Sequence, residues 1–164
     1  MPIPEIIPIA YEPDYHTDTI GRYAEGQFFA SIVYASPESY AHDDDWPEHQ
    51  RLYAVLHRFD PDGRHMGSDI WSAGTYAEQL RRPHAEDSVS ARARARLAEL
   101  LDGLPGREYG DIAIRPFRLV VDGVVFGLVA EREDDIEGGG EDEWVELYPD
   151  QLGFSAPWDG VYDT

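Results

Sequence analysis

The alternation of apolar and polar positions predicts that most of this chain folds as antiparallel hairpins. Residues 27–35 read Gln-Phe-Phe-Ala-Ser-Ile-Val-Tyr-Ala, which places apolar side chains on both faces of an extended strand. We therefore expect this strand at the centre of a sheet, covered on both sides. Residues 17–23 precede it across a short turn and are expected to pair with it.

Two further hairpins are predicted around the turns Asp60–Gly63 and Asp122-Gly123, because each turn lies between apolar runs. The run before Asp60 fits helical spacing as well as strand alternation, and the turn that follows it favours the hairpin. The expected flanking strands, with one last short strand, are 50–59, 64–72, 109–121, 124–131 and 144–148.

One main amphipathic helix is predicted at about residues 84–103. Pro83 suits its first turn, and Gly103 marks its end. Its apolar face consists of Val89, Ala93, Leu97, Leu100, Leu101 and Leu104. Thr75 and Glu78 have capping-box spacing before a shorter helical segment. Together these elements predict an α+β fold, with a mostly antiparallel sheet of about 6–7 strands and the main helix packed on it.

The length of 164 residues favours a single domain, 1–164. Prolines in residues 1–16 predict an extended arm whose isoleucines dock on the domain. Residues 132–142 are rich in acids and glycine, and we expect them to form a mobile acidic loop. Residues 149–164 are expected to form an irregular C-terminal tail with three aromatic residues packed on the domain: Phe154, Trp158 and Tyr162.

The composition is strongly acidic, with 33 Asp and Glu, 13 Arg, no Lys and a net charge of −20. Such a surface repels nucleic acid and anionic lipid, so we expect no nucleic-acid partner and no membrane partner. The absence of Cys excludes disulfides and thiolate metal sites, and no histidine spacing matches a metal motif. We therefore expect no cofactor and no metal. No signal peptide or apolar span is visible, so the expected location is the cytoplasm.

Tryptophans beside acidic residues are the feature that predicts a function. Aromatic anchors within an acidic rim suit a partner rich in arginine or lysine. The leading hypothesis is therefore a non-enzymatic interaction or regulatory module that binds a basic protein partner. Each tryptophan is alternatively a core residue. The predicted interaction residues are Asp43, Asp44, Asp45, Trp46, Glu141, Asp142, Glu143, Trp144, Trp158 and Asp159.

Two other functions stay open. His57 and His65 flank the Asp60–Gly63 turn and can approach each other across the hairpin. The second hypothesis is therefore a small-molecule-binding protein or enzyme with a His/carboxylate site in a sheet-lined cleft. A deep apolar pocket with convergent polar groups would favour that function. A DNA mimic or a toxin-immunity-type inhibitor is the third alternative, although the acids cluster in loops and do not line one long helix.

Several stretches of the chain resemble a group of small actinobacterial proteins. They are Ile20-Gly21-Arg22-Tyr23, Gly26-Gln27-Phe28-Phe29, the run from Tyr53 to Asp60, Gly67-Ser68-Asp69-Ile70-Trp71, Pro157-Trp158-Asp159-Gly160 and Tyr162-Asp163-Thr164. Most of the chain is thereby similar to proteins labelled formate hydrogenlyase regulatory protein. The resemblance implies a regulatory, non-enzymatic role, and it carries over no functional residues.

Overall fold

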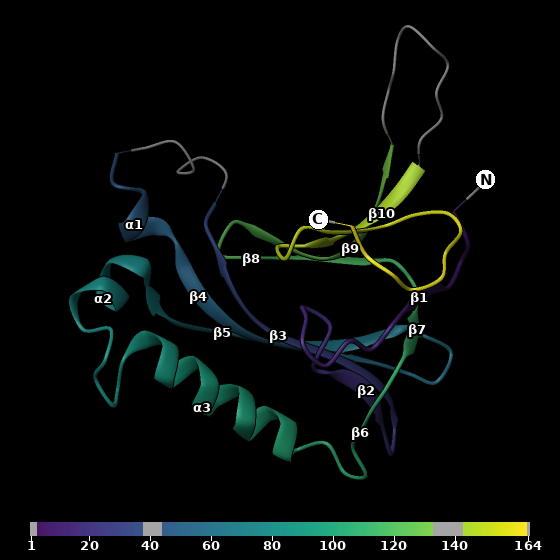
Figure 1. Ribbon diagram of the computed structural model, residues 1–164, viewed down its shortest axis with the longest axis horizontal. Coiled ribbons are helices and arrows are strands. Elements are labelled where there is room, and N and C mark those ends of the chain that lie inside the picture. The colour runs from purple at the N-terminus through teal and green to yellow at the C-terminus, as the bar shows by residue number, and fades with distance from the viewer. Residues whose placement is uncertain (1–2, 38–43, 133–142, 164) are drawn as a thin grey trace, which may run out of the picture.

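The computed structural model describes residues 3–37, 44–132 and 143–163 of the chain (Figure 1). Its helices are α1 (Trp46–His49), α2 (Tyr76–Arg81) and α3 (Val89–Asp102). Its strands are β1 (Ile7–Ile9), β2 (Ile20–Tyr23), β3 (Gly26–Ala35), β4 (Arg51–Phe59), β5 (His65–Thr75), β6 (Glu108–Tyr109), β7 (Ile112–Ile114), β8 (Phe117–Val121), β9 (Val124–Arg132), β10 (Glu143–Tyr148) and β11 (Leu152–Phe154). The predicted α+β class is confirmed, with more strands than the sequence indicated.

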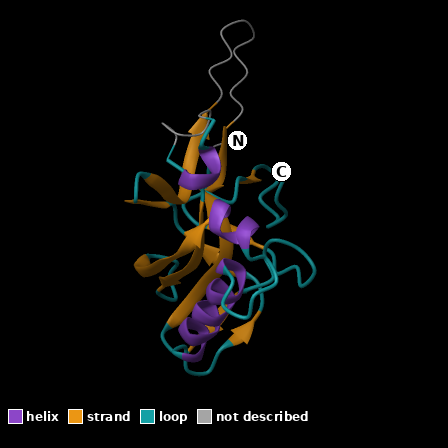
Figure 2. Cartoon of the chain, turned by 90° about the vertical axis from the view of Figure 1, so that its left-hand side faces the viewer, coloured by secondary structure: helices purple, strands orange, loops and turns teal. Residues whose placement is uncertain are grey.

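The strands form three antiparallel sheets, and the two larger sheets pack face to face. One has the order β5-β4-β3-β2-β6 and the other β11-β10-β9-β8, while β1 pairs with β7 in a short ribbon. The main helix α3 covers the outer face of the five-stranded sheet, so the molecule has a helix layer and two sheet layers (Figures 1 and 2). The outer face of the four-stranded sheet carries no helix among the described residues.

The central strand β3 explains this layering. Phe28 and Ala30 face α3, whereas Phe29 and Ala35 point into the space between the two sheets. Both phenylalanines are at most 1% exposed, which confirms that apolar side chains on both faces mark a strand covered on both sides.

The main helix begins later than expected, at Val89 and not near residue 84. The Ser88 hydroxyl accepts a hydrogen bond from the Ala91 amide at 3.1 Å and so caps the helix. Pro83 consequently lies in the connection between α2 and α3. The capping box of Thr75 and Glu78 is confirmed at the start of α2.

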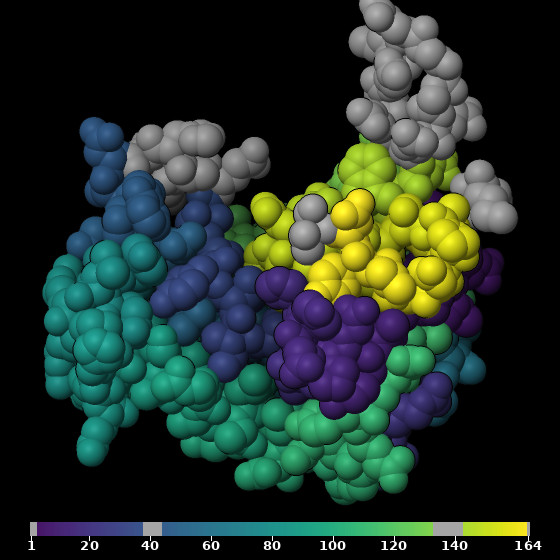
Figure 3. All heavy atoms as spheres, viewed as in Figure 1, coloured from purple at the N-terminus to yellow at the C-terminus, as the bar shows by residue number. Residues whose placement is uncertain are grey.

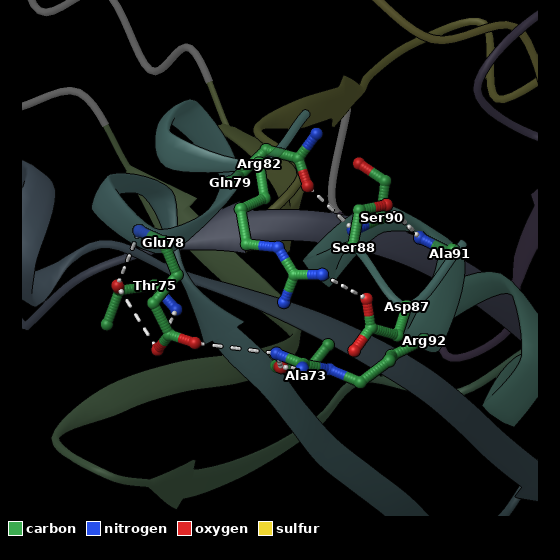
Figure 4. A network of polar contacts seen from close by, with 10 residues as sticks. All are labelled: Ala73, Thr75, Glu78, Gln79, Arg82, Asp87, Ser88, Ser90, Ala91 and Arg92. Atoms are coloured by element: carbon green, nitrogen blue, oxygen red, sulfur yellow. Dashed lines mark hydrogen bonds and ion pairs between the residues drawn. The ribbon is translucent and has the colours of Figure 1, made fainter. Parts of the chain in front are cut away.

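A polar network fixes α2 and α3 to strand β5 (Figure 4). The Arg92 guanidinium donates to the Ala73 carbonyl oxygen at 2.7 Å and lies 3.5 Å from Glu78. Arg82 pairs with Asp87 across the α2–α3 connection at 3.2 Å. Two arginines on the helix side of the molecule therefore form ion pairs that stabilise the packing of α2, α3 and β5.

Both predicted turns are present. Asp122 and Gly123 adopt φ values of 54° and 77°, as in the two-residue turn that suits a twisted hairpin. Gly63 has a φ of 86°, and a Cβ there would lie 2.7 Å from the Ala113 carbonyl oxygen. Only glycine fits this turn, because it packs directly against β7.

The N-terminal arm and the C-terminal tail both dock on the domain. Ile7 and Ile9 in β1 are fully buried, whereas Ile6 is 38% exposed. The tail residue Phe154 is 2% exposed, and Trp158 and Tyr162 pack against the same core cluster. Figure 3 shows the tail, in yellow, against the N-terminal segment, in purple, where the Ala10 amide donates to the Gly160 carbonyl at 2.9 Å. The predicted acidic loop lies outside the described residues except for Arg132, which ends β9.

None of the helices in the described part of the chain is long and apolar enough to cross a membrane.

Candidate functional site

Strand β10 has one face in the core and one face turned outward. Val145 and Leu147 are at most 1% exposed and belong to the core between the sheets. Trp144, Glu146 and Tyr148 alternate with them and are half-buried on the outer face of the four-stranded sheet. The pairing of β10 with β9 puts Trp144 opposite Glu131, which lies on the same outer face.

Glu131, Trp144, Glu146 and Tyr148 form a set of contacts that we call the glutamate–aromatic cluster. The Tyr148 hydroxyl donates a hydrogen bond to Glu131 Oε1 at 2.8 Å, and it also interacts with Glu146. The Trp144 indole nitrogen donates to Glu146 Oε1 at 3.3 Å. Two carboxylates from neighbouring strands therefore converge on one hydroxyl, with an aromatic ring beside each.

The cluster has more negative charge than its own donors compensate. Burial raises the pKa of Tyr148 above its ordinary value of 10, and hydrogen bonds to Glu131 and Glu146 raise it further, so the hydroxyl keeps its proton at neutral pH. The single hydroxyl proton of Tyr148 is the hydrogen-bond donor for both carboxylates, Glu131 and Glu146. Like charges held this close favour a cation between them, and the flanking rings suit a guanidinium or ammonium group.

The predicted residues around Trp46 lie at the other end of the molecule, since Figure 1 shows α1 at the left and β10 at the right. Trp46 is 41% exposed and stacks on Tyr76, with ring centroids 5.3 Å apart. Asp44 is exposed, and Asp45 lies 3.0 Å from the His49 ring. This end thus has an exposed ring, but one of its two described aspartates already has a partner.

The other predicted interaction residues are spread over the rest of the structure. Glu143 is the half-buried first residue of β10, next to the cluster. Trp158 packs on the core, and its buried indole nitrogen has no hydrogen-bond partner among the residues described. Asp159 beside it accepts a hydrogen bond from the Val161 amide. Three predicted residues lie outside the described residues: Asp43, Glu141 and Asp142.

The two histidines of the alternative site do meet, through a serine between them. The Ser68 hydroxyl lies 2.6 Å from His57 Nδ1 and 2.7 Å from His65 Nε2. The ring of Phe117 stacks on the His65 imidazole at a centroid distance of 4.5 Å and meets the His57 imidazole edge-on at 4.9 Å. The group sits between the two sheets, because His57 is on the inner face of β4 and only 2% exposed.

Both imidazoles are neutral at physiological pH. Burial, followed by the charge of His65, lowers the pKa of His57 to about 3, and burial also lowers the pKa of His65. The serine hydroxyl can then donate to one ring nitrogen and accept from the protonated nitrogen of the other. This bridge, which joins β4 to β5, satisfies all three polar atoms.

A serine beside an imidazole is also the first part of a nucleophile–base pair. A base with a pKa near 3 removes a proton weakly at neutral pH, and the third group here is a second histidine, where a carboxylate was expected. Among the described residues, no group of three His, Asp or Glu could hold a metal ion. The arrangement of His57, Ser68 and His65 thus fits a structural bridge better than a catalytic site.

Asp150 is a further titratable residue, which the sequence did not single out. It is half-buried in the turn between β10 and β11, where its carboxyl faces Ser31 of β3. Desolvation raises the pKa of this carboxyl to about 6, and interactions with Ser31 and His16 oppose the shift. Asp150 is therefore a carboxyl next to β3 whose pKa burial raises well above its ordinary value.

Sequence reasoning found Trp144 but missed the residues that complete its cluster. Glu146 and Tyr148 could have been found from their alternation with Trp144 along a predicted strand, because this spacing places all three side chains on one face. Glu131 could not be identified in this way, because only the register between β9 and β10 brings it to Tyr148. Comparison of the chain with protein-family models, curated proteins and solved structures finds no match, so its function has to be inferred from its own residues.

Proposed function

We propose that this protein is a non-enzymatic interaction module that binds an arginine- or lysine-rich segment of a partner protein at the glutamate–aromatic cluster. The observation that carries the proposal is the convergence of Glu131 and Glu146 on the single hydroxyl of Tyr148. A guanidinium group offers several donors in one plane, and it can bind both carboxylates while it stacks on Trp144 or Tyr148.

The charge of the whole chain supports a basic partner. Even if each of the 13 arginines neutralised one carboxylate, 20 acidic side chains would keep their charge. Arginines on the helix side already pair with acids, as Arg81 does with Glu48 at 3.0 Å and Arg92 with Glu78. A field of this sign accelerates the approach of a cationic partner, and salt weakens it.

The interior of the fold also supports a surface function. Large side chains fill the space between the sheets, and Phe29, Tyr53 and Phe126 are each at most 1% exposed. The outer face of the four-stranded sheet, by contrast, presents half-buried aromatic rings next to the carboxylates of Glu131 and Glu146. A half-buried aromatic surface with a charged rim is typical of a protein-binding site.

The test uses a nine-residue arginine peptide, titrated into the full chain by calorimetry at low and physiological salt. We expect the Glu131→Gln/Glu146→Gln double variant to lose about tenfold in affinity, because two charge-assisted contacts become neutral. The control is Glu86→Gln/Glu108→Gln, which removes the same charge from two exposed acids elsewhere. Its affinity should fall by less than about twofold, since distant exposed charges are screened.

Equal losses in the two double variants would contradict the proposal, because binding would then follow the net charge alone. The same conclusion would follow if Trp144→Ala and Tyr148→Phe left the affinity of the arginine peptide unchanged. A matched glutamate peptide should not bind at either salt concentration.

A further inference from the structure

A groove runs between the C-terminal half of α3 and the five-stranded sheet. Figure 1 shows that α3 lies on the opposite side of this sheet from β10, the strand that carries most of the glutamate–aromatic cluster. Its volume is about 380 Å³, within the range of pockets that hold small molecules. Its apolar lining includes Leu56 on β4, Leu100 on α3 and Leu104 just beyond α3. The groove is therefore wide enough for a short alkyl chain or a single ring.

Tyr23 at the end of β2 lines this groove, and its hydroxyl has no hydrogen-bond partner in the described part of the chain. The residue is 8% exposed, so an unpaired polar atom is held in a nearly dry environment. Leaving a buried hydroxyl unpaired is unfavourable, and native proteins rarely do so without a reason. A ligand in the groove would provide the missing hydrogen bond.

The charges around the hydroxyl indicate what kind of ligand fits. Arg58, the cation of the groove lining, is paired with Asp69 at 2.5 Å. Glu99 is likewise paired, with Arg96 at 3.1 Å. Glu25 also lines the groove and acts electrostatically on the Tyr23 hydroxyl, and it forms no ion pair among the described residues. One unpaired carboxylate therefore lies near one unpaired hydroxyl.

We infer that this groove binds a small primary amine with an apolar body. The ammonium group donates hydrogen bonds to the Tyr23 oxygen and the Glu25 carboxylate, while the apolar body packs on Leu56, Leu100 and Leu104. Glu25 belongs to the exposed two-residue turn between β2 and β3, so its carboxylate is open to an approaching amine. The inference is independent of the function proposed for the glutamate–aromatic cluster.

The test follows backbone amide chemical shifts in the full chain during titration with n-pentylamine, n-pentanol and n-pentanoate. We expect saturable shifts around Gly103 and Leu104 with pentylamine, at a dissociation constant of about 1 mM, as suits a ligand of six heavy atoms. The uncharged alcohol and the anion should bind at least about fivefold more weakly, because neither can pair with Glu25. Equal binding of the three compounds, or no saturable shift with the amine, would overturn the inference.

Two variants test the residues assigned to the ammonium group. Tyr23→Phe should weaken pentylamine binding about fivefold, and Glu25→Gln should do the same. Tyr23→Phe should not lower the unfolding midpoint, because the hydroxyl it removes has no partner in the free protein. The control is Tyr109→Phe, which changes a neighbouring tyrosine, 47% exposed, outside the groove, and should not alter binding. Unchanged affinity in Tyr23→Phe, or an equal loss in Tyr109→Phe, would refute the site.

Discussion

The glutamate–aromatic cluster and the His57–Ser68–His65 bridge are built in the same way and differ in what they leave unsatisfied. In each, neighbouring antiparallel strands bring together polar side chains that are distant in the sequence. In the bridge, one hydroxyl satisfies two neutral imidazoles between the sheets. In the cluster, one hydroxyl is shared by two carboxylates on an outer face.

This difference is the basis for proposing that the bridge stabilises the fold and that the cluster binds a partner. A buried group whose atoms satisfy one another rigidifies the core, and it has no capacity left for a ligand. A half-buried group with excess charge gains free energy when a cation arrives. The residue types alone would rank the two sites the other way, because serine and histidine are the familiar catalytic residues.

The largest expected effect is on the stability of the inner bridge. Ser68→Ala should lower the free energy of unfolding by about 2–4 kcal/mol, because the buried imidazole of His57 and the half-buried imidazole of His65 lose their hydrogen-bond partner. The measurement is urea denaturation at pH 7.5. Ser72→Ala is the control, since the hydroxyl of Ser72 lies in the same strand, buried and without a partner among the described residues. It should not lower the free energy of unfolding, because it removes an unpaired buried hydroxyl, and a similar loss in both variants would show that the bridge has no special role.

The second expected effect is the change in the free energy of unfolding with pH that His57 causes. Asp150 causes a change of opposite sign, which partly cancels it. The folded protein keeps His57 neutral down to a pKa of about 3, while the unfolded chain takes up the proton near 6.5. Stability from His57 is therefore present above pH 6.5 and is lost as the pH falls. Asp150 acts in the opposite direction, because its folded pKa of about 6 exceeds its ordinary 3.8, so its contribution becomes unfavourable as the pH rises through this interval.

Removing Asp150 should separate these two responses. In Asp150→Asn, lowering the pH from 7.5 to 4.5 should reduce the free energy of unfolding by about 2–3 kcal/mol, from the titration of His57. Asp150→Asn/His57→Gln is the control and should lose most of this dependence. Asp150→Asn alone should be more stable than the natural chain at pH 7.5 by about 1–2 kcal/mol. A flat profile in Asp150→Asn would show that His57 is not held neutral by burial.

The smallest expected effect is on the stability of the outer cluster. Glu146→Gln should leave the free energy of unfolding unchanged or raise it by less than about 1 kcal/mol, because it removes the repulsion between two half-buried carboxylates. Thermal unfolding at pH 7.5 measures this change. Leu147→Ala is the contrast, since it truncates the adjacent buried residue of β10 and should destabilise by about 2–5 kcal/mol. A large loss in Glu146→Gln would make the cluster structural, like the bridge.

Local signals in the sequence predicted much of the fold. The Asp122-Gly123 turn, the capping box of Thr75 and the apolar face of α3 are each set by residues within a few positions of one another. The start of α3 was misplaced because Pro83 and Ser88 are both acceptable first-turn signals, and only the Ser88 hydrogen bond to Ala91 selects between them. The sequence predicts one long strand at 109–121, which the structure divides into β6, β7 and β8 with breaks at residues 110–111 and 115–116.

The candidate sites were less predictable than the fold, for a physical reason. Trp144 was identified from its acidic neighbours in sequence, whereas its partners in the structure are residues two positions along the strand and across the hairpin. Trp46 had a similar sequence context, yet it stacks on Tyr76 at the other end of the molecule. Adjacency in sequence says little about which side chains meet, because successive residues of a strand point to opposite faces.

The sequence by itself determined the α+β class, the hairpins, the main helix and the excess of negative charge, since these depend on composition and on periodicity over short windows. Tertiary structure alone decided the pairing of β1 with β7, a contact between segments about a hundred residues apart. It also decided the convergence of Glu131 and Glu146 on Tyr148, and the groove beside Tyr23. Such contacts depend on strand register and sheet packing, which arise from the burial of the whole core and not from any one segment.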